Sequence, residues 1–173
     1  MAKKFNLREF QTNLSRQLQA ATTRETAFSR LGFQVGSNNW LVPLDHAEEV
    51  IPVPAIIPVP GTQRWFRGMA NIRGNLFAVT DFSDFMNGTP TPETSGCRLV
   101  IAHHQFGVNA ALLVSRTLGL RNANALEPIQ AATDQPWISQ KYRDDARQEW
   151  MDLNFPALLN NADFLKVEAD ARN

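Results

Sequence analysis

Histidine is the commonest catalytic and metal-binding side chain at neutral pH, and the sequence contains three. His103 and His104 are adjacent in an apolar run that predicts a strand, where neighbouring side chains point to opposite faces. They are therefore not expected to bind one ion; we expect one on the surface and the other half-buried. His46 has no second ligand at metal-binding spacing. The histidines thus predict no metal site.

Two carboxylate clusters, Glu48-Glu49 and Asp81 with Asp84, could in principle supply a general acid and a general base. The sequence contains no phosphate-binding loop, dinucleotide fingerprint, Gly-x-Ser-x-Gly elbow or His-Glu-x-x-His helix to accompany them. Solvated charges at strand ends account for Glu48 and Asp84, and Asp81 is well placed to cap a short helix beginning at Phe82. We expect no catalytic centre, cofactor or metal.

The N-terminal segment shows a helical period. Its apolar stripe consists of Leu7, Phe10, Leu14 and Leu18. This spacing predicts an amphipathic helix that docks either on the main body or on a partner. We assign residues 1–26 to this helix and a linker.

From residue 27 onward the hydrophobic period is alternating, which is typical of strands. Pairs of such runs around turn residues predict hairpins at 31–44, 69–79 and 98–114. Residues 137–153 fit either a helix or a hairpin with a polar turn, and we favour the hairpin.

Segments rich in proline and glycine separate these predicted strands. Residues 50–60 carry four prolines, which cannot donate to a sheet ladder, so this segment should run at an edge or between strands. Residues 87–96 form the most linker-like stretch.

Trp65, Phe66 and Phe85 fit either core aromatics or interface anchors. Many short strands with little helix predict an all-β fold of one or two small barrels.

The amino-acid composition limits the classes of protein and partner that are plausible. A chain of 173 residues with 43% hydrophobic and 20% charged residues fits one folded domain or two very small ones. Lys+Arg 17 balances Asp+Glu 17, so neither a nucleic acid nor an anionic membrane is the default partner. The single cysteine, Cys97, allows no internal disulfide, and no signal-peptide core or membrane span is recognisable. A reducing cytosol fits best.

Residues 57–82, IPVPGTQRWFRGMANIRGNLFAVTDF, combine a Val-Pro segment, a Gly-x-x-Asn-x-Arg-Gly turn and an apolar strand followed by aspartate. This stretch resembles the signature of the CheW-type chemotaxis adaptors, and the similarity covers about residues 27 to 160. The N-terminal extension and the motif Pro-Val-Pro-Gly-Thr-x-x-Trp-Phe are similar to the sequences of family members that serve twitching motility by type IV pili. Ala78 stands where the family usually has proline, and Ser115 where it usually has aspartate.

The resemblance implies a fold of two five-stranded, SH3-like β-barrels packed side by side, with an N-terminal helix and short connecting helices. The domain would span residues 27–165, followed by a tail at 166–173. The implied function is that of a non-catalytic, cytoplasmic adaptor at membrane-bound receptor arrays. Such adaptors bind the cytoplasmic hairpin tip of a methyl-accepting chemoreceptor in the groove between the barrels. They separately bind the regulatory domain of a CheA-type histidine kinase.

Family positions carried over to this sequence imply a receptor site, whereas the kinase-contact residues remain unknown. Glu49 and Arg73 would face the groove as charged residues. The implied apolar lining consists of Ala47, Leu99, Ala111 and Leu120. From the residues alone, Arg73 is better explained as a turn arginine in solvent, and it is the resemblance that favours the receptor groove.

A small-barrel nucleic-acid-binding protein is the alternative function. Such barrels bind through aromatic side chains on a basic face. Arg64, Arg67 and Arg73 are the one local concentration of positive charge that could serve this purpose.

Overall fold

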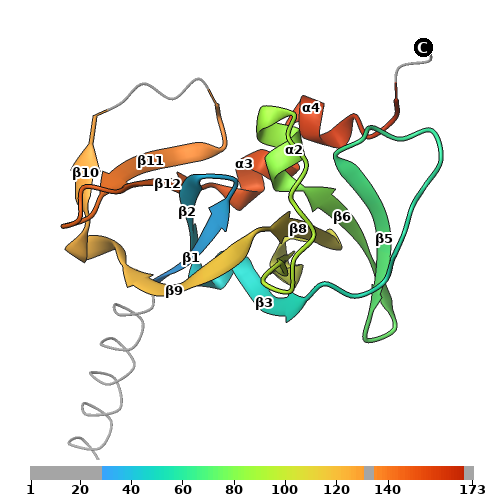
Figure 1. Ribbon diagram of the computed structural model, residues 1–173, viewed down its shortest axis with the longest axis horizontal. Helices are drawn as coiled ribbons and strands as arrows, with labels where there is room; N and C mark the ends of the chain where they lie inside the picture. The colour runs from blue at the N-terminus through green and yellow to red at the C-terminus, as the bar shows by residue number, and fades with distance from the viewer. Residues whose placement is uncertain (1–28, 131–134, 170–173) are drawn as a thin grey trace, which may run out of the picture.

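The computed structural model describes residues 29–130 and 135–169, so the expected helix and linker at 1–26 lie outside the described residues. The described chain forms two six-stranded mixed sheets joined by short helices (Figure 1). Sheet A has the order β10-β11-β12-β2-β1-β9, and sheet B has the order β3-β7-β8-β6-β5-β4.

Sheet A consists of β1 Ser29–Val35, β2 Asn38–Pro43, β9 Arg116–Asn122, β10 Glu127–Ile129, β11 Ile138–Arg143 and β12 Glu149–Leu153. Sheet B consists of β3 Ala47–Pro52, β4 Ile56–Ile57, β5 Phe66–Ile72, β6 Asn75–Asp81, β7 Arg98–Ala102 and β8 Ala110–Val114. The helical elements are η1 Leu44–His46, α2 Phe82–Asn87, η2 His104–Phe106, η3 Ala123–Ala125, α3 Phe155–Leu159 and α4 Ala162–Leu165. Most neighbouring strands are antiparallel, whereas β12 runs parallel to β2 and β6 parallel to β8.

Strands β7 and β8 are buried on both faces, which explains their continuous apolar runs. Val100 and Leu112 point into a core shared with sheet A, while Leu99 and Ala111 point into a second core within sheet B. Since alternate residues point to opposite faces, one strand can supply both cores. The two sheets therefore pack around a common core and form one folded unit.

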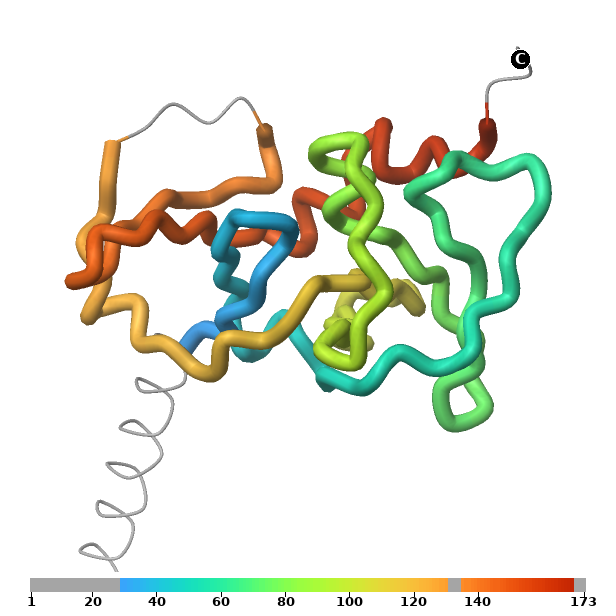
Figure 2. The backbone as a smooth tube through the Cα atoms, in the orientation of Figure 1, coloured from blue at the N-terminus to red at the C-terminus, as the bar shows by residue number. Residues whose placement is uncertain are grey.

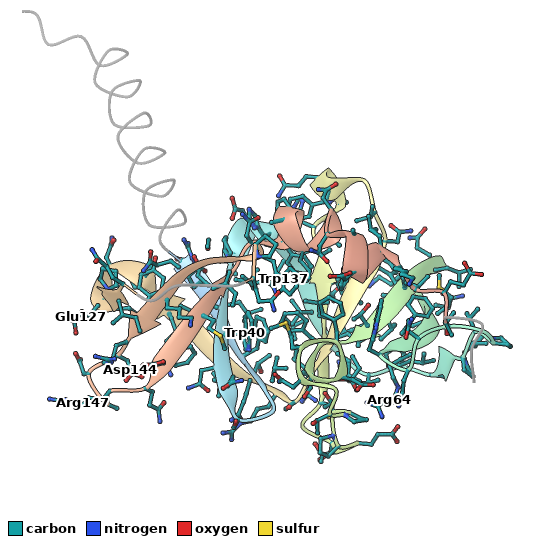
Figure 3. The ribbon with its side chains drawn as sticks, turned by 90° about the horizontal axis from the view of Figure 1, so that it is seen from above. Trp40, Arg64, Glu127, Trp137, Asp144 and Arg147 are labelled. Atoms are coloured by element: carbon teal, nitrogen blue, oxygen red, sulfur yellow. The ribbon has the colours of Figure 1, made fainter. Side chains whose placement is uncertain are left out.

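Helices α2, α3 and α4 lie close together between the two sheets (Figure 2). Aromatic side chains pack against one another there, and Trp137 lies near the middle of the molecule (Figure 3). The Phe85 ring centroid lies 5.2 Å from that of Trp65, 5.5 Å from that of Trp137 and 5.3 Å from that of Phe164. Trp65, Phe66 and Phe85 are all half-buried. These three aromatics therefore pack within the protein, as expected of core residues.

The all-β prediction and its hairpins are confirmed, including the hairpin over residues 137–153, which is β11 and β12. At its turn, the Trp150 indole donates to Asp144 Oδ2 at 3.0 Å, which ties the polar turn back to the strand. The expected strand count is wrong, because each sheet has six strands rather than five. Closure of the sheets into SH3-like barrels stays a prediction.

The folded unit extends beyond the expected boundary at residue 165. Gln63 N donates to Val167 O at 2.7 Å, and Ala169 N donates to Gly61 O at 2.9 Å. Residues 167–169 are therefore anchored to the loop before β5, while the rest of the expected tail, 170–173, lies outside the described residues. No helix within 29–130 and 135–169 is both long enough and apolar enough to cross a bilayer.

Candidate docking surface

The turn between β5 and β6 holds an arginine in an unfavourable backbone conformation. Arg73 and Gly74 form a two-residue turn with φ angles of 53° and 87°, and Asn71 Oδ1 accepts a hydrogen bond from Gly74 N at 2.9 Å. Glycine adopts such angles freely, whereas a residue with a side chain loses about 1 kcal/mol. A strained arginine at an exposed turn points to a role for its side chain.

The guanidinium of Arg73 forms an ion pair with Glu49 on β3. Arg73 Nη2 donates to Glu49 Oε1 at 2.6 Å. Although β3 and the β5–β6 hairpin are not neighbours in sheet B, the sheet curves around the second core, to which Ile51 of β3 and Ile72 of β5 both contribute. The Arg73 side chain is 76% exposed and that of Glu49 32%, so both can reach a partner.

The four apolar residues of the implied groove divide into two pairs. Leu120 on β9 is 65% exposed, and Ala47 on β3 is half-buried. Leu99 and Ala111 are 0% and 1% exposed, because both point into the second core. In this structure these two side chains therefore do not line the surface.

We call Ala47, Glu49, Arg73 and Leu120 the docking surface. Its residues come from β9, β3 and the β5–β6 turn, which follow one another in this order from left to right along the lower side of the molecule in Figure 1. The surface thus spans elements of both sheets.

Carboxylates gather on the β3 side of this surface. Asp45 and Glu48 are exposed there, beside Glu49. The backbone N–H of His104 and its Nδ1 lie 2.9 Å and 3.1 Å from Glu48 Oε2. These hydrogen bonds, the backbone one foremost, hold the pKa of Glu48 below its usual value. The contact between Glu48 and His104 has no signature in the sequence, because the two residues lie on different elements.

His103 and His104 do not continue β7 as expected, because the strand ends at Ala102. Their rings stack, with centroids 4.2 Å apart at an angle of 29°, so the expectation of opposite faces is wrong. The expected burial is confirmed: His104 is exposed and His103 half-buried. Over residues 29–130 and 135–169, no group of three or more histidines, cysteines or carboxylates could hold a metal ion.

Asp81 and Asp84 are structural carboxylates. Asp81 is fully buried, caps α2 as predicted, and accepts hydrogen bonds from Thr91 N at 2.9 Å and Thr91 Oγ1 at 2.7 Å. Asp84 is 5% exposed, so the expectation of a solvated charge is wrong; it accepts two hydrogen bonds from Arg64, at 2.6 Å and 2.9 Å. Together, the contacts of Asp81 and Asp84 attach the linker-like stretch 87–96 to sheet B.

A hollow with a volume of about 630 Å³ opens beside sheet B. Its walls are the proline-rich segment after β3 and the segment before β7. Arg67 lines it, but its guanidinium is already paired with Glu93 at 2.8 Å. No residue of the docking surface lines this hollow.

A second exposed feature is an apolar face on β4, β5 and β6. Ile57 pairs with Met69, and Met69 pairs with Ala78, so these three side chains share one face. Leu76 lies two residues before Ala78 and therefore points the same way. Ile57 is 67% and Leu76 55% exposed. We call these four residues the apolar face.

Residues 30–163 match the family model of the CheW-like domain. Protein PilI of Pseudomonas aeruginosa is 28% identical over 147 residues, covering 82% of this chain and 80% of that protein. The crystal structure of the scaffolding protein TtCheW from Thermoanaerobacter tengcongensis has the same fold, with a TM-score of 0.65 at 18% identity over 75% of this chain and 85% of that one. These findings confirm the resemblance stated from residues 57–82. The chain belongs to the CheW-like domain family, whose members are non-catalytic scaffolds of chemotaxis-type signalling.

Proposed function

We propose that this chain is an adaptor that couples the cytoplasmic hairpin tip of a methyl-accepting chemoreceptor to the regulatory domain of a CheA-type histidine kinase. The observation that carries the receptor site is the exposed ion pair of Glu49 with Arg73, an arginine held in a strained conformation. The likeness to PilI supports a role in type IV pilus signalling and twitching motility. The adaptor would act in the cytoplasm, at receptor arrays.

The docking surface has the chemistry that a helical tip requires. Leu120 and Ala47 offer apolar contact to a helix, while Glu49 and Arg73 present charges of both signs at its side. Apolar burial supplies affinity in such interfaces, whereas the charges mainly set register and orientation. The exposed ion pair contributes little to folding, so its selective value would lie in the partner contact.

An adaptor needs a second surface for its second partner, and the apolar face is the best candidate. Exposed large apolar side chains such as Ile57 and Leu76, gathered on one sheet face, are typical of protein interfaces. We propose that the kinase regulatory domain covers this face.

The alternative of nucleic-acid binding loses its one supporting feature. Arg64 is paired with Asp84, Arg73 with Glu49, and Arg67 with two carboxylates, Asp81 and Glu93. A phosphate backbone would have to displace these carboxylates, and the net charge of zero offers no compensating attraction.

The receptor site is tested by reversing the charge of Arg73. Arg73→Glu should weaken binding of a receptor hairpin-tip fragment by about 1 to 3 kcal/mol, which is roughly 5- to 150-fold in Kd, because it faces Glu49 with a like charge. Arg143→Glu is the matched control, since Arg143 also forms an exposed hairpin ion pair, with Glu149, but on sheet A. Unchanged affinity of Arg73→Glu at both low and physiological salt would contradict the receptor site.

The kinase site is tested in the same binding assay. Leu76→Glu should weaken binding of the kinase regulatory domain and leave receptor-tip binding unchanged, because Leu76 lies outside the docking surface. Arg73→Glu should show the opposite pattern. If both substitutions weaken the same partner and spare the other, the assignment of two separate surfaces is wrong.

A further inference from the structure

The N-terminal segment enters the fold beside the docking surface. β1 begins at Ser29, which pairs with Asn122 of β9, and Leu31 pairs with Leu120. Residues 1–28 therefore join the described chain two positions along the ladder from the exposed leucine of the docking surface.

Leu120 is an unusual residue for its position. Its partner on β1, Leu31, is 8% exposed, whereas Leu120 is 65% exposed on an edge strand. Arg116 and Arg121 place charge on this strand, but Leu120 itself is an exposed apolar side chain at a sheet edge, which favours aggregation. A covering segment would remove this liability.

The sequence of the N-terminal segment complements the surface in polarity and charge. Its apolar stripe, described above, can cover Leu120 and Ala47. Residues 1–20 contain four basic side chains, at positions 3, 4, 8 and 16, and one acidic side chain, at position 9. The β3 side of the docking surface carries Asp45, Glu48 and Glu49, of which Glu49 pairs with Arg73.

Chain length permits the contact. Residues 19–28 can span up to about 33 Å, enough to turn back from Ser29. A helix over residues 7–18 would be about 18 Å long, and the seven residues of β9 measure about 23 Å. The stripe and the strand are therefore of similar length.

We propose that the N-terminal segment docks on the docking surface through this stripe and competes there with the receptor tip. Its docking rests on the features of this chain alone, whereas the competition rests on the proposed receptor site. The linker makes the contact intramolecular, so a weak interaction suffices for high occupancy. The segment then acts as an internal brake that a receptor must displace.

The experiment uses the full chain and needs no receptor. Asn122→Cys places a thiol on β9 two residues from Leu120, on the same side of the strand. Its alkylation rate is compared in a stripe variant, Phe10→Ser with Leu14→Ser, and in a control variant whose changes lie off the stripe, Asn13→Ser with Gln19→Ser. If the segment is docked about three quarters of the time, the stripe variant should react about four times faster than the control.

A second thiol is the control that detects a general loosening of the fold. Leu165→Cys on α4, at an exposed site on the other side of the molecule in Figure 1, should react equally fast in both backgrounds. Cys97, which is 6% exposed and present in every variant, should stay slow. Equal rates for Asn122→Cys in the stripe and control variants would overturn the docking.

Receptor-tip affinity is then measured with the same two variants. The stripe variant should bind the tip about four times more tightly, since an equilibrium that hides the site reduces the apparent affinity by the same factor. Faster alkylation with unchanged tip affinity would overturn the competition and leave the docking in place. Failure of the tip to bind either variant would count against the proposed receptor site instead.

Discussion

At Gly68, strand β5 approaches β4 so closely that there is no room for a side chain. The φ of Gly68 is 122°, and a Cβ built on it would lie 2.0 Å from the carbonyl oxygen of Ile57 on β4. Side-chain Cβ atoms essentially never approach closer than 3.0 Å, so in Gly68→Ala this carbonyl must move by about 1 Å. The substitution should therefore separate β4 from β5.

The expected cost has three parts. The backbone conformation disfavours alanine by about 1 to 2 kcal/mol. Displacement of Ile57 from Met69 loses one or two hydrogen bonds at about 1 kcal/mol each. Ile56, which packs against the second core, loses part of its burial at about 1 kcal/mol. Gly68→Ala should thus lower the free energy of unfolding by about 3 to 5 kcal/mol.

The assay is urea-induced unfolding followed by tryptophan fluorescence, with Gly61→Ala as the control. Gly61 also has a positive φ, 76°, but no atom lies within 4 Å of its built Cβ, so alanine should cost about 1 kcal/mol there. With a slope near 2 kcal/mol per molar urea, the midpoint for Gly68→Ala should lie about 1 M or more below that of the control. Equal midpoints would refute the view that this contact holds β4 in place.

Four further substitutions, at three positions, test the buried carboxylate, the strained turn and the pH dependence. Asp81→Ala should lower the free energy of unfolding by about 2 to 4 kcal/mol in the same urea assay, because it removes the α2 cap and both Thr91 contacts; Asp81→Asn should be milder. Arg73→Asn should raise stability by up to about 1 kcal/mol, since asparagine tolerates positive φ, and yet weaken receptor-tip binding; a parallel fall in both would show that Arg73 is structural. Burial lowers the pKa of His46 below its usual 6.5, so the unfolded chain takes up the proton first and stability falls as the pH drops below that value. His46→Gln should lose less stability than the wild type between about pH 7.5 and pH 5.5; equal losses would place the acid sensitivity elsewhere.

The sequence alone determined the local elements and the family. Alternating apolar residues identified the hairpins, because a half-buried strand repeats every two residues. The turn Arg73-Gly74 and the cap at Asp81 were recognisable because both depend on residues close in the chain. The motif in residues 57–82 identified the family, since its glycines, prolines and charges stand at fixed spacings.

Only the tertiary structure decided which residues meet across the chain. The pairing of Glu49 with Arg73 follows from the curvature of sheet B, and no local pattern encodes that curvature. Leu99 and Leu120 look equally apolar in the sequence, yet one is fully buried and the other 65% exposed. The difference arises because Leu99 points into the second core, whereas Leu120 on the edge strand β9 belongs to neither core of the described chain. Strand order is set by contacts between distant segments, so burial at a given position cannot be read from periodicity alone.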